Sequence, residues 1–301
     1  MNHYLRPISR YTSNTVLAEI AAQLPGYAPA VQVADTCLHR LQALYLDPEK
    51  ADSAADIERI LASGEVPDDF GQHLARQRAY IEDHQNQRAV LDDLAKRAVI
   101  QCESIISGAA PTILTELNTR MTATVSDVRT LAQDLDGVHC ADDALAAGEK
   151  AADAWRQLPT LRAGYDALRT AQTIVMGENY SSLLERSRQT GDSDRLARDT
   201  DIANLDQVWP SWRGQTVHEV PRDAISHARL IPAPWPADPL AQLVWLATSD
   251  AKVWIPTKAQ LEELWTDRKR ADQEAILAAR RAEREGKPNP QRRMQTATSI
   301  F

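Results

Sequence analysis

The sequence predicts a mainly α-helical protein: a helical bundle with a long antiparallel coiled-coil hairpin, then a Trp/Pro-rich irregular segment and a C-terminal basic helix. Three observations predict this fold class. Aromatic residues make up only 5% of the chain and Gly accounts for 11 of its 301 residues, which favours helix over sheet. No proline lies between Pro67 and Pro111. Beyond Pro111, apolar residues recur at alternating steps of three and four, as in a coiled-coil seam.

The first 66 residues are expected to form short helices after an irregular start. Asn14 or Ser13 can cap the first of them, and Pro25-Gly26 would stop it, because proline and glycine interrupt helices. The expected helices are 15–24, 31–46 and 48–62.

The hairpin is expected between residues 67 and 136. Pro67 followed by two Asp residues suits a helix start, and roughly 40 residues of helix would be about 60 Å long. The short link 107–111 would return a second helix antiparallel to the first. The seam of that second helix consists of Leu114, Leu117, Met121, Val128, Leu131 and Leu135, with Thr124 in the same register.

Two further helices are expected at 141–157 and 159–176, because Pro159 can open a new helix, and a short one at 194–206. The stretch DGVHCADD, residues 136–143, brings His, Cys and Asp together in the sequence. Adjacent side chains point in different directions, whereas a metal needs three or four converging ligands. We therefore interpret it as a turn between helices with Asp as the N-cap.

The composition changes after about residue 206. Six of the seven Trp residues lie between 209 and 265, together with a cluster of prolines, and IPAPWPADP (231–239) must be largely extended. A helix is expected at 239–248. Three roles are open for the indoles: the core of a small segment, a protein-binding patch, or a ligand platform. The partner-binding hypothesis names Trp209, Trp212 and Trp235.

The last helix, expected at 257–285, leads into a basic tail. Residues 268–301 contain nine basic and four acidic side chains, a net charge of +5, whereas the whole chain carries −8, which leaves −13 for residues 1–267. The tail is either a solvated helix, a segment that docks on an acidic partner or a neighbouring copy, or a nucleic-acid contact. The docking hypothesis names Arg280, Arg281, Arg284, Arg292, Arg293 and Phe301.

The sequence divides into four predicted regions: 1–66, 67–206, 207–256 and 257–301. The three cysteines are far apart and none is in a CxxC pair, so we expect reduced thiols and synthesis in the cytoplasm. Apolar runs are too short for a membrane span, and no motif indicates a metal or cofactor site.

The sequence therefore predicts a non-enzymatic structural or assembly protein that acts through helices and docking segments. The expected partner is a second copy or another structural protein, rather than nucleic acid or a membrane. The high content of Ala, and of Arg relative to Lys, suggests a bacterial or bacteriophage origin, such as a virion or scaffolding-type component incorporated into a viral particle. Two alternatives stay open: an intracellular adaptor that binds one protein through the Trp-rich segment, and a nucleic-acid-associated protein that uses the basic tail.

Overall fold

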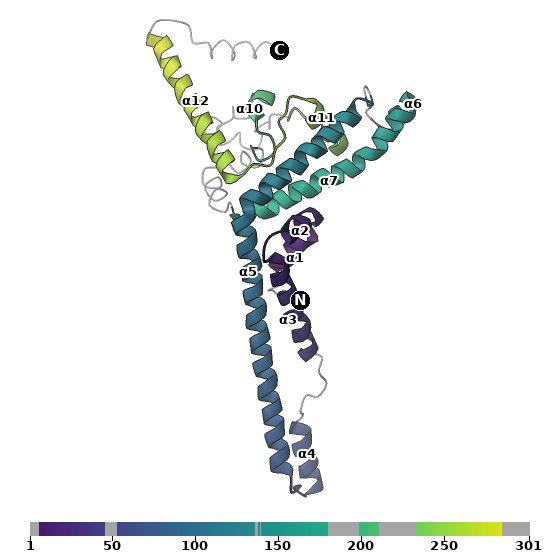
Figure 1. Ribbon diagram of the computed structural model, residues 1–301, viewed down its shortest axis with the longest axis vertical. Coiled ribbons are helices and arrows are strands. Elements are labelled where there is room, and N and C mark those ends of the chain that lie inside the picture. The colour runs from purple at the N-terminus through teal and green to yellow at the C-terminus, as the bar shows by residue number, and fades with distance from the viewer. Residues whose placement is uncertain are drawn as a thin grey trace, which may run out of the picture. The chain divides into compact units, whose positions relative to one another are not determined.

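The structure, a computed structural model, describes residues 6–45, 53–135, 138, 140–179, 199–210 and 233–284. These residues are mainly α-helical, as the sequence predicts. Across the described ranges the β pairing is limited to an isolated antiparallel bridge between Ile202 and Val253. The helices are α1 (Arg6–Ser13), α2 (Thr15–Ala22), α3 (Tyr27–Tyr45), α4 (Ser53–Ser63), α5 (Phe70–Ala132), α6 (Ala141–Ala147), α7 (Glu149–Asn179), α10 (Leu205–Val208), α11 (Pro239–Thr248) and α12 (Lys258–Arg284) (Figure 1).

The chain forms two compact units. Unit 1 comprises Met1–Ile113 and Arg169–Asn179, and unit 2 comprises Leu114–Leu168 and Tyr180–Phe301. The division falls inside α5 and inside α7, so each of these helices contributes one segment to either unit.

The start of unit 1 shows how local sequence sets the helix boundaries. The side chain of Asn14 accepts a hydrogen bond from the backbone N–H of Leu17 at 2.9 Å, which caps α2 as predicted. Gly26 has a φ of +81°, a conformation that glycine adopts without a steric cost, and it separates α2 from α3. The irregular start that the sequence predicts is wrong from residue 6 onward, because α1 occupies Arg6–Ser13.

Helix α3 lies against α5 in the opposite direction. A Cβ on Gly26, just before α3, would lie 3.6 Å from Cδ1 of Ile105. The last turns of α3 line a groove together with residues 83–91 of α5. The start of α3 is thus near residue 105 and its end near residue 87. Cys37 and Cys102 are buried in this layer.

The predicted turn at 107–111 is wrong, because α5 continues through it for 63 residues with Pro111 inside the helix. At about 1.5 Å per residue the helix is about 95 Å long. Proline lacks an N–H and crowds the carbonyl of residue i−4. Here Ile106, Ala110 and Ile113 are buried at helical spacing across the link. Tertiary packing of this continuous face outweighs the lost hydrogen bond.

The residues of the expected seam lie in unit 2, and all but Leu135 lie in α5, which ends at Ala132. Leu114, Leu117, Met121 and Val128 are fully buried, Leu135 is 6% exposed and Leu131 is half-buried. Figure 1 draws α7 returning alongside this part of α5, after a connection that contains α6. The chain thus reverses beyond residue 132 rather than at 107–111.

The boundary expected between the helices 141–157 and 159–176 is wrong, because the break lies at Gly148 rather than at Pro159. Gly148, with a φ of +113°, separates α6 from α7, and α7 runs through Pro159. Leu158 and Ala154 are buried next to the proline, so packing again decides. The N-cap of α6 is Cys140, without a side-chain hydrogen bond, and not an Asp; Asp142 and Asp143 lie in the first turn, where negative charge suits the helix dipole.

Polar contacts hold α11 of unit 2 to α5 and α7. Helix α11 begins at Pro239 and is capped by Asp238, which confirms the helix expected at 239–248. Arg129 of α5 donates to the carbonyl of Ala247 at 2.8 Å, and Arg162 of α7 donates to that of Pro239 at 2.7 Å. Of the helix expected at 194–206, residues 194–198 lie outside the described ranges, and the following turn leads into the four-residue α10.

Candidate functional site

Helix α12 begins with a capping box. The side chain of Gln260 accepts a hydrogen bond from the backbone N–H of Thr257 at 2.8 Å, and the hydroxyl of Thr257 accepts one from the N–H of Gln260 at 3.4 Å. This reciprocal Thr-x-x-Gln arrangement satisfies two of the donors that every helix start leaves open. The capping box thus sets the residue at which α12 begins.

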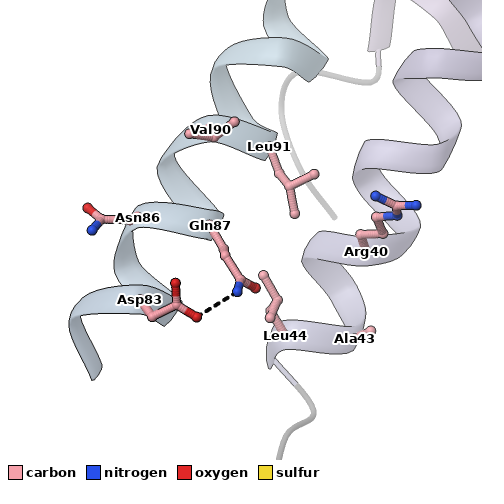
Figure 2. A pocket seen from close by; sticks show the side chains of 8 residues that line it. All are labelled: Arg40, Ala43, Leu44, Asp83, Asn86, Gln87, Val90 and Leu91. Atoms are coloured by element: carbon pink, nitrogen blue, oxygen red, sulfur yellow. Dashed lines mark hydrogen bonds between the residues drawn. The ribbon is translucent and has the colours of Figure 1, made fainter. Parts of the chain in front are cut away.

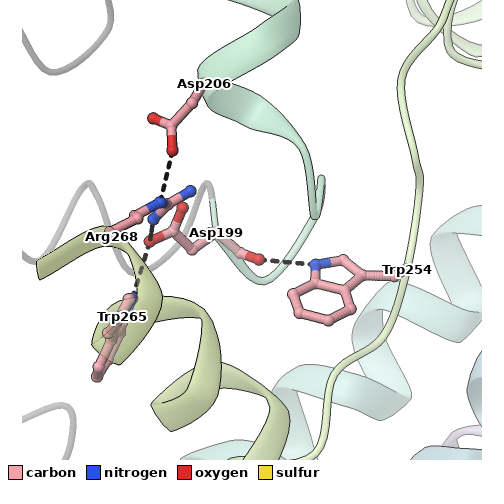
Figure 3. Close-up of polar contacts among 5 residues, drawn as sticks. All are labelled: Asp199, Asp206, Trp254, Trp265 and Arg268. Atoms are coloured by element: carbon pink, nitrogen blue, oxygen red, sulfur yellow. Dashed lines mark hydrogen bonds and ion pairs between the residues drawn. The ribbon is translucent and has the colours of Figure 1, made fainter. Parts of the chain in front are cut away.

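A buried carboxylate holds the first three turns of α12 against the rest of unit 2 through hydrogen bonds. Asp199 is 2% exposed. Its Oδ2 accepts hydrogen bonds from Nε1 of Trp265 at 3.0 Å and from Nη1 of Arg268 at 2.6 Å (Figure 3). Its backbone carbonyl accepts a third from Nε1 of Trp254 at 2.8 Å. We call Asp199, Asp206, Trp254, Trp265 and Arg268 the anchor.

Arg268 joins two carboxylates within the anchor. Its Nε donates to Oδ2 of Asp206, the acidic residue of α10, at 2.7 Å. Burial alone would lower the pKa of Arg268, but the hydrogen bond and charge of Asp199, followed by those of Asp206, raise it above its ordinary value. The guanidinium therefore stays charged, and it ties α12 to the chain around α10 with charge-assisted hydrogen bonds.

The chain around Asp199 is fixed from its other side by residues 250–254. The backbone N–H of Ala203 donates to the carbonyl of Lys252 at 2.9 Å, and the backbone N–H of Trp254 donates to the backbone carbonyl of Asp201 at 3.2 Å. The side chain of Asn204 both donates to the carbonyl of Asp250 and accepts from the N–H of Lys252. The segment that carries Asp199 is thus held by both backbone and side-chain hydrogen bonds to residues 250–254.

The second half of α12 has the opposite character. Beyond Arg268 nearly every described side chain is exposed, including Arg280 and Arg281. Ile276 and Leu277 are 53% and 52% exposed. Arg284 is the last residue of the helix, whereas Arg292, Arg293 and Phe301 lie outside the described residues.

Two of the three indoles proposed as partner contacts, those of Trp209 and Trp235, pack against each other. Trp209 is only 5% exposed and meets the ring of Trp235 edge-on, with centroids 5.4 Å apart. Trp235, half-buried, also contacts Trp245 at 5.8 Å. In this conformation the indole of Trp209 is part of the core of the segment, and its role in binding a partner stays a prediction. Trp212 lies outside the described residues.

Unit 1 contains a groove of about 750 Å³ between α3 and α5. Leu44, Val90 and Leu91 give it an apolar wall, and Nε2 of Gln87 donates to Asp83 at 2.7 Å (Figure 2). None of the lining residues is a Ser, Cys, His or Lys, and Asp83 is the one lining residue with a carboxylate. The lining residues are Arg40, Ala43, Leu44, Asp83, Asn86, Gln87, Val90 and Leu91.

Unit 1 also contains a buried hydroxyl, that of Tyr27. It is buried and forms no hydrogen bond with the described residues. Burial, followed by the nearby Cys102 and Asp35, raises the pKa of Tyr27 to about 12. Burial also raises the pKa of the Cys102 thiol, so both groups stay protonated at neutral pH.

Among the described residues no three His, Cys, Asp or Glu side chains come together where they could hold a metal ion. His139 and Asp136 of the DGVHCADD stretch are outside that part of the chain. One helix, α5, contains an 18-residue stretch with a mean hydropathy of 1.2, of which 39% is buried. The core helix of a globular protein has the same composition, so this stretch is weak evidence for a membrane span.

No family model, no curated protein and no solved structure matches this chain.

The sequence-based reasoning found the exposed arginines of α12 but not its anchor. Trp265 and Arg268 are three residues apart and share a helix face, which is the only local signal. Asp199 is 69 residues from Arg268, and only the folded chain brings them together.

Proposed function

We propose that the protein is a non-enzymatic structural protein that assembles with copies of itself, and that α12 is its docking element. The observation that supports this most directly is the contrast within α12. Its first turns are anchored through buried, charge-assisted hydrogen bonds, while its second half exposes Ile276, Leu277 and two arginines. A helix fixed at one end presents a face with little loss of conformational freedom on binding.

The chemistry of the described polar groups fits this role better than catalysis. The buried carboxylate of Asp199 already receives donors from Trp265 and Arg268. Aromatic and arginine side chains fixed in this way hold a helix in place, and the groove in unit 1 is lined by no Ser, Cys, His or Lys. A bacteriophage virion or scaffolding-type protein is one instance of an assembly protein, and that assignment stays a prediction from composition.

The test is the mass of the full-length protein in solution, measured by light scattering across a range of concentrations. We expect a multimer of the 33.4 kDa chain, with an absorbance ratio at 260 and 280 nm typical of protein alone. A mass of one chain at every concentration would contradict self-assembly. An elevated ratio that salt removes would favour the nucleic-acid alternative.

A pair of variants locates the docking element. Replacing Ile276 and Leu277 by Ser should lower the mass, because both apolar side chains would be buried on assembly. The matched control replaces Ile57 and Leu61 of α4, which are 47% and 76% exposed, by Ser. If the control lowers the mass and the α12 variant does not, α4 rather than α12 mediates assembly.

A further inference from the structure

The exposed half of α12 segregates its charges. At about 100° per residue, one side of the helix carries the apolar pair and the cations, while Asp272 and Glu274 lie on either side of it. Arg270 on this side also pairs with Asp267 at 3.2 Å, an exposed contact of the kind that contributes little. We call this side the basic face; it consists of Lys269, Arg270, Ile276, Leu277, Arg280 and Arg281.

Unit 2 also carries a surface of the opposite charge, where the chain passes from α5 to α7. Residues 134–149 contain five acidic residues and neither Lys nor Arg. Of these five acids, Asp134, Asp142, Asp143 and Glu149 are described, and all four are exposed. Leu145 of α6 is 64% exposed among them. We call the four described acids Asp134, Asp142, Asp143 and Glu149, together with Leu145, the acidic tip.

We infer that the basic face of α12 docks on the acidic tip of a second copy of this chain. The two surfaces are complementary. Each has exposed apolar side chains that an interface would bury, and the charges around these side chains are opposite in sign. This inference rests on the proposed self-assembly and names the surface that α12 contacts.

The partner is a second copy because of the arrangement within unit 2. Figure 1 draws α12 leading away from the paired segments of α5 and α7, with α6 at the far end of that pair. The basic face and the acidic tip of one chain are therefore apart. Because the two contacting surfaces differ, the contact either repeats head to tail as a ring or filament or is exchanged reciprocally across a twofold axis.

The test exchanges the charges of the two surfaces. One variant carries Arg280→Glu with Arg281→Glu, and a second carries Asp142→Lys with Asp143→Lys. Each places like charges opposite each other, so we expect the association constant to fall at least tenfold. A third variant carries all four substitutions. It restores opposite charges across the contact and should recover the wild-type mass, as should an equimolar mixture of the two pair variants.

Two controls separate this effect from a general effect of charge or misfolding. Asp68→Lys with Asp69→Lys changes an adjacent, exposed Asp pair just before α5, and Lys96→Glu with Arg97→Glu changes an adjacent cationic pair on α5. Both should keep the wild-type mass. Circular dichroism should show the same helix content in every variant.

The outcomes distinguish the two proposals. If the pair variants lose association and neither the mixture nor the four-fold variant recovers it, the acidic tip is not the partner, while assembly through α12 stands. If reversing Arg280 and Arg281 leaves a wild-type multimer intact, the docking of α12 is overturned, although the protein still assembles. A wild-type protein that is monomeric at every concentration overturns both.

Discussion

The two halves of α12 carry similar residues in opposite environments. In the first half, Arg268 is 11% exposed at its side chain and bonds to two carboxylates. In the second half, Arg280 and Arg281 are exposed on the helix surface. An arginine in the first half contributes to folding, because removing it leaves a buried charge without compensation. An arginine in the second half is accessible to a partner, because its side chain is exposed.

The largest expected effect comes from removing the buried arginine. Arg268→Ala should lower the free energy of unfolding by about 3–5 kcal/mol, because Asp199 would remain buried without its cation. Denaturant unfolding followed by circular dichroism measures it. The control is Arg270→Ala, whose side chain is 66% exposed. It should change stability by less than about 1 kcal/mol. Equal losses in the two variants would show that the anchor does not stabilise α12.

A smaller loss is expected from the indole that shares the same carboxylate oxygen. Trp265→Phe keeps an aromatic ring but removes the N–H that donates to Asp199 at 3.0 Å. We expect a loss of about 1–3 kcal/mol, the range for a hydrogen bond to a charged group. Chemical denaturation gives the value. A stability equal to the wild type would mean that this hydrogen bond is not formed in solution.

The contacts of Arg268 and Trp265 could not be predicted from the sequence, whereas several helix boundaries could. Capping and breaking signals are local, so Asn14, Gly26 and Pro239 set helix boundaries that the sequence predicts well. Pro111 and Pro159 give the same local signal and mislead, because buried faces continue across both prolines. The pairing of Asp199 with Arg268 depends on the tertiary fold, and no spacing in the chain reveals it.

Unit 1 contains a buried hydroxyl with no hydrogen-bond partner among the described residues, and its removal should raise the free energy of unfolding rather than lower it. Tyr27→Phe removes a buried hydroxyl that forms no hydrogen bond with the described residues. We expect a gain of about 1 kcal/mol in the free energy of unfolding. A loss of similar size would show that the hydroxyl has a partner in solution.

The pH dependence of the same variant tests the cause. Because the folded-state pKa of Tyr27 is raised from 10.0 to about 12, the folded protein binds more protons than the unfolded chain between these values. The stability of the wild type should therefore fall as pH rises through this window, by on the order of 2 kcal/mol. Unfolding titrations at pH 9, 11 and 12 should show a smaller decline in Tyr27→Phe.

The smallest effect on stability is expected at the exposed end of α12. Arg280→Ala with Arg281→Ala should change the free energy of unfolding by less than about 0.5 kcal/mol, as surface substitutions usually do. The same variant should show a reduced mass in light scattering, because its docking face has lost two cations. Unfolding curves that shift strongly would place these arginines in the folded core of unit 2 and remove the contrast between the two halves.

Hydrogen–deuterium exchange along α12, at low and high protein concentration, tests the central claim most directly. Residues 258–268 should be protected at both concentrations, because the anchor forms within one copy. Residues 269–284 should exchange rapidly at low concentration and slow down at high concentration, as the exposed face becomes covered by a second copy. Exchange in residues 269–284 that is rapid and independent of concentration would contradict the account.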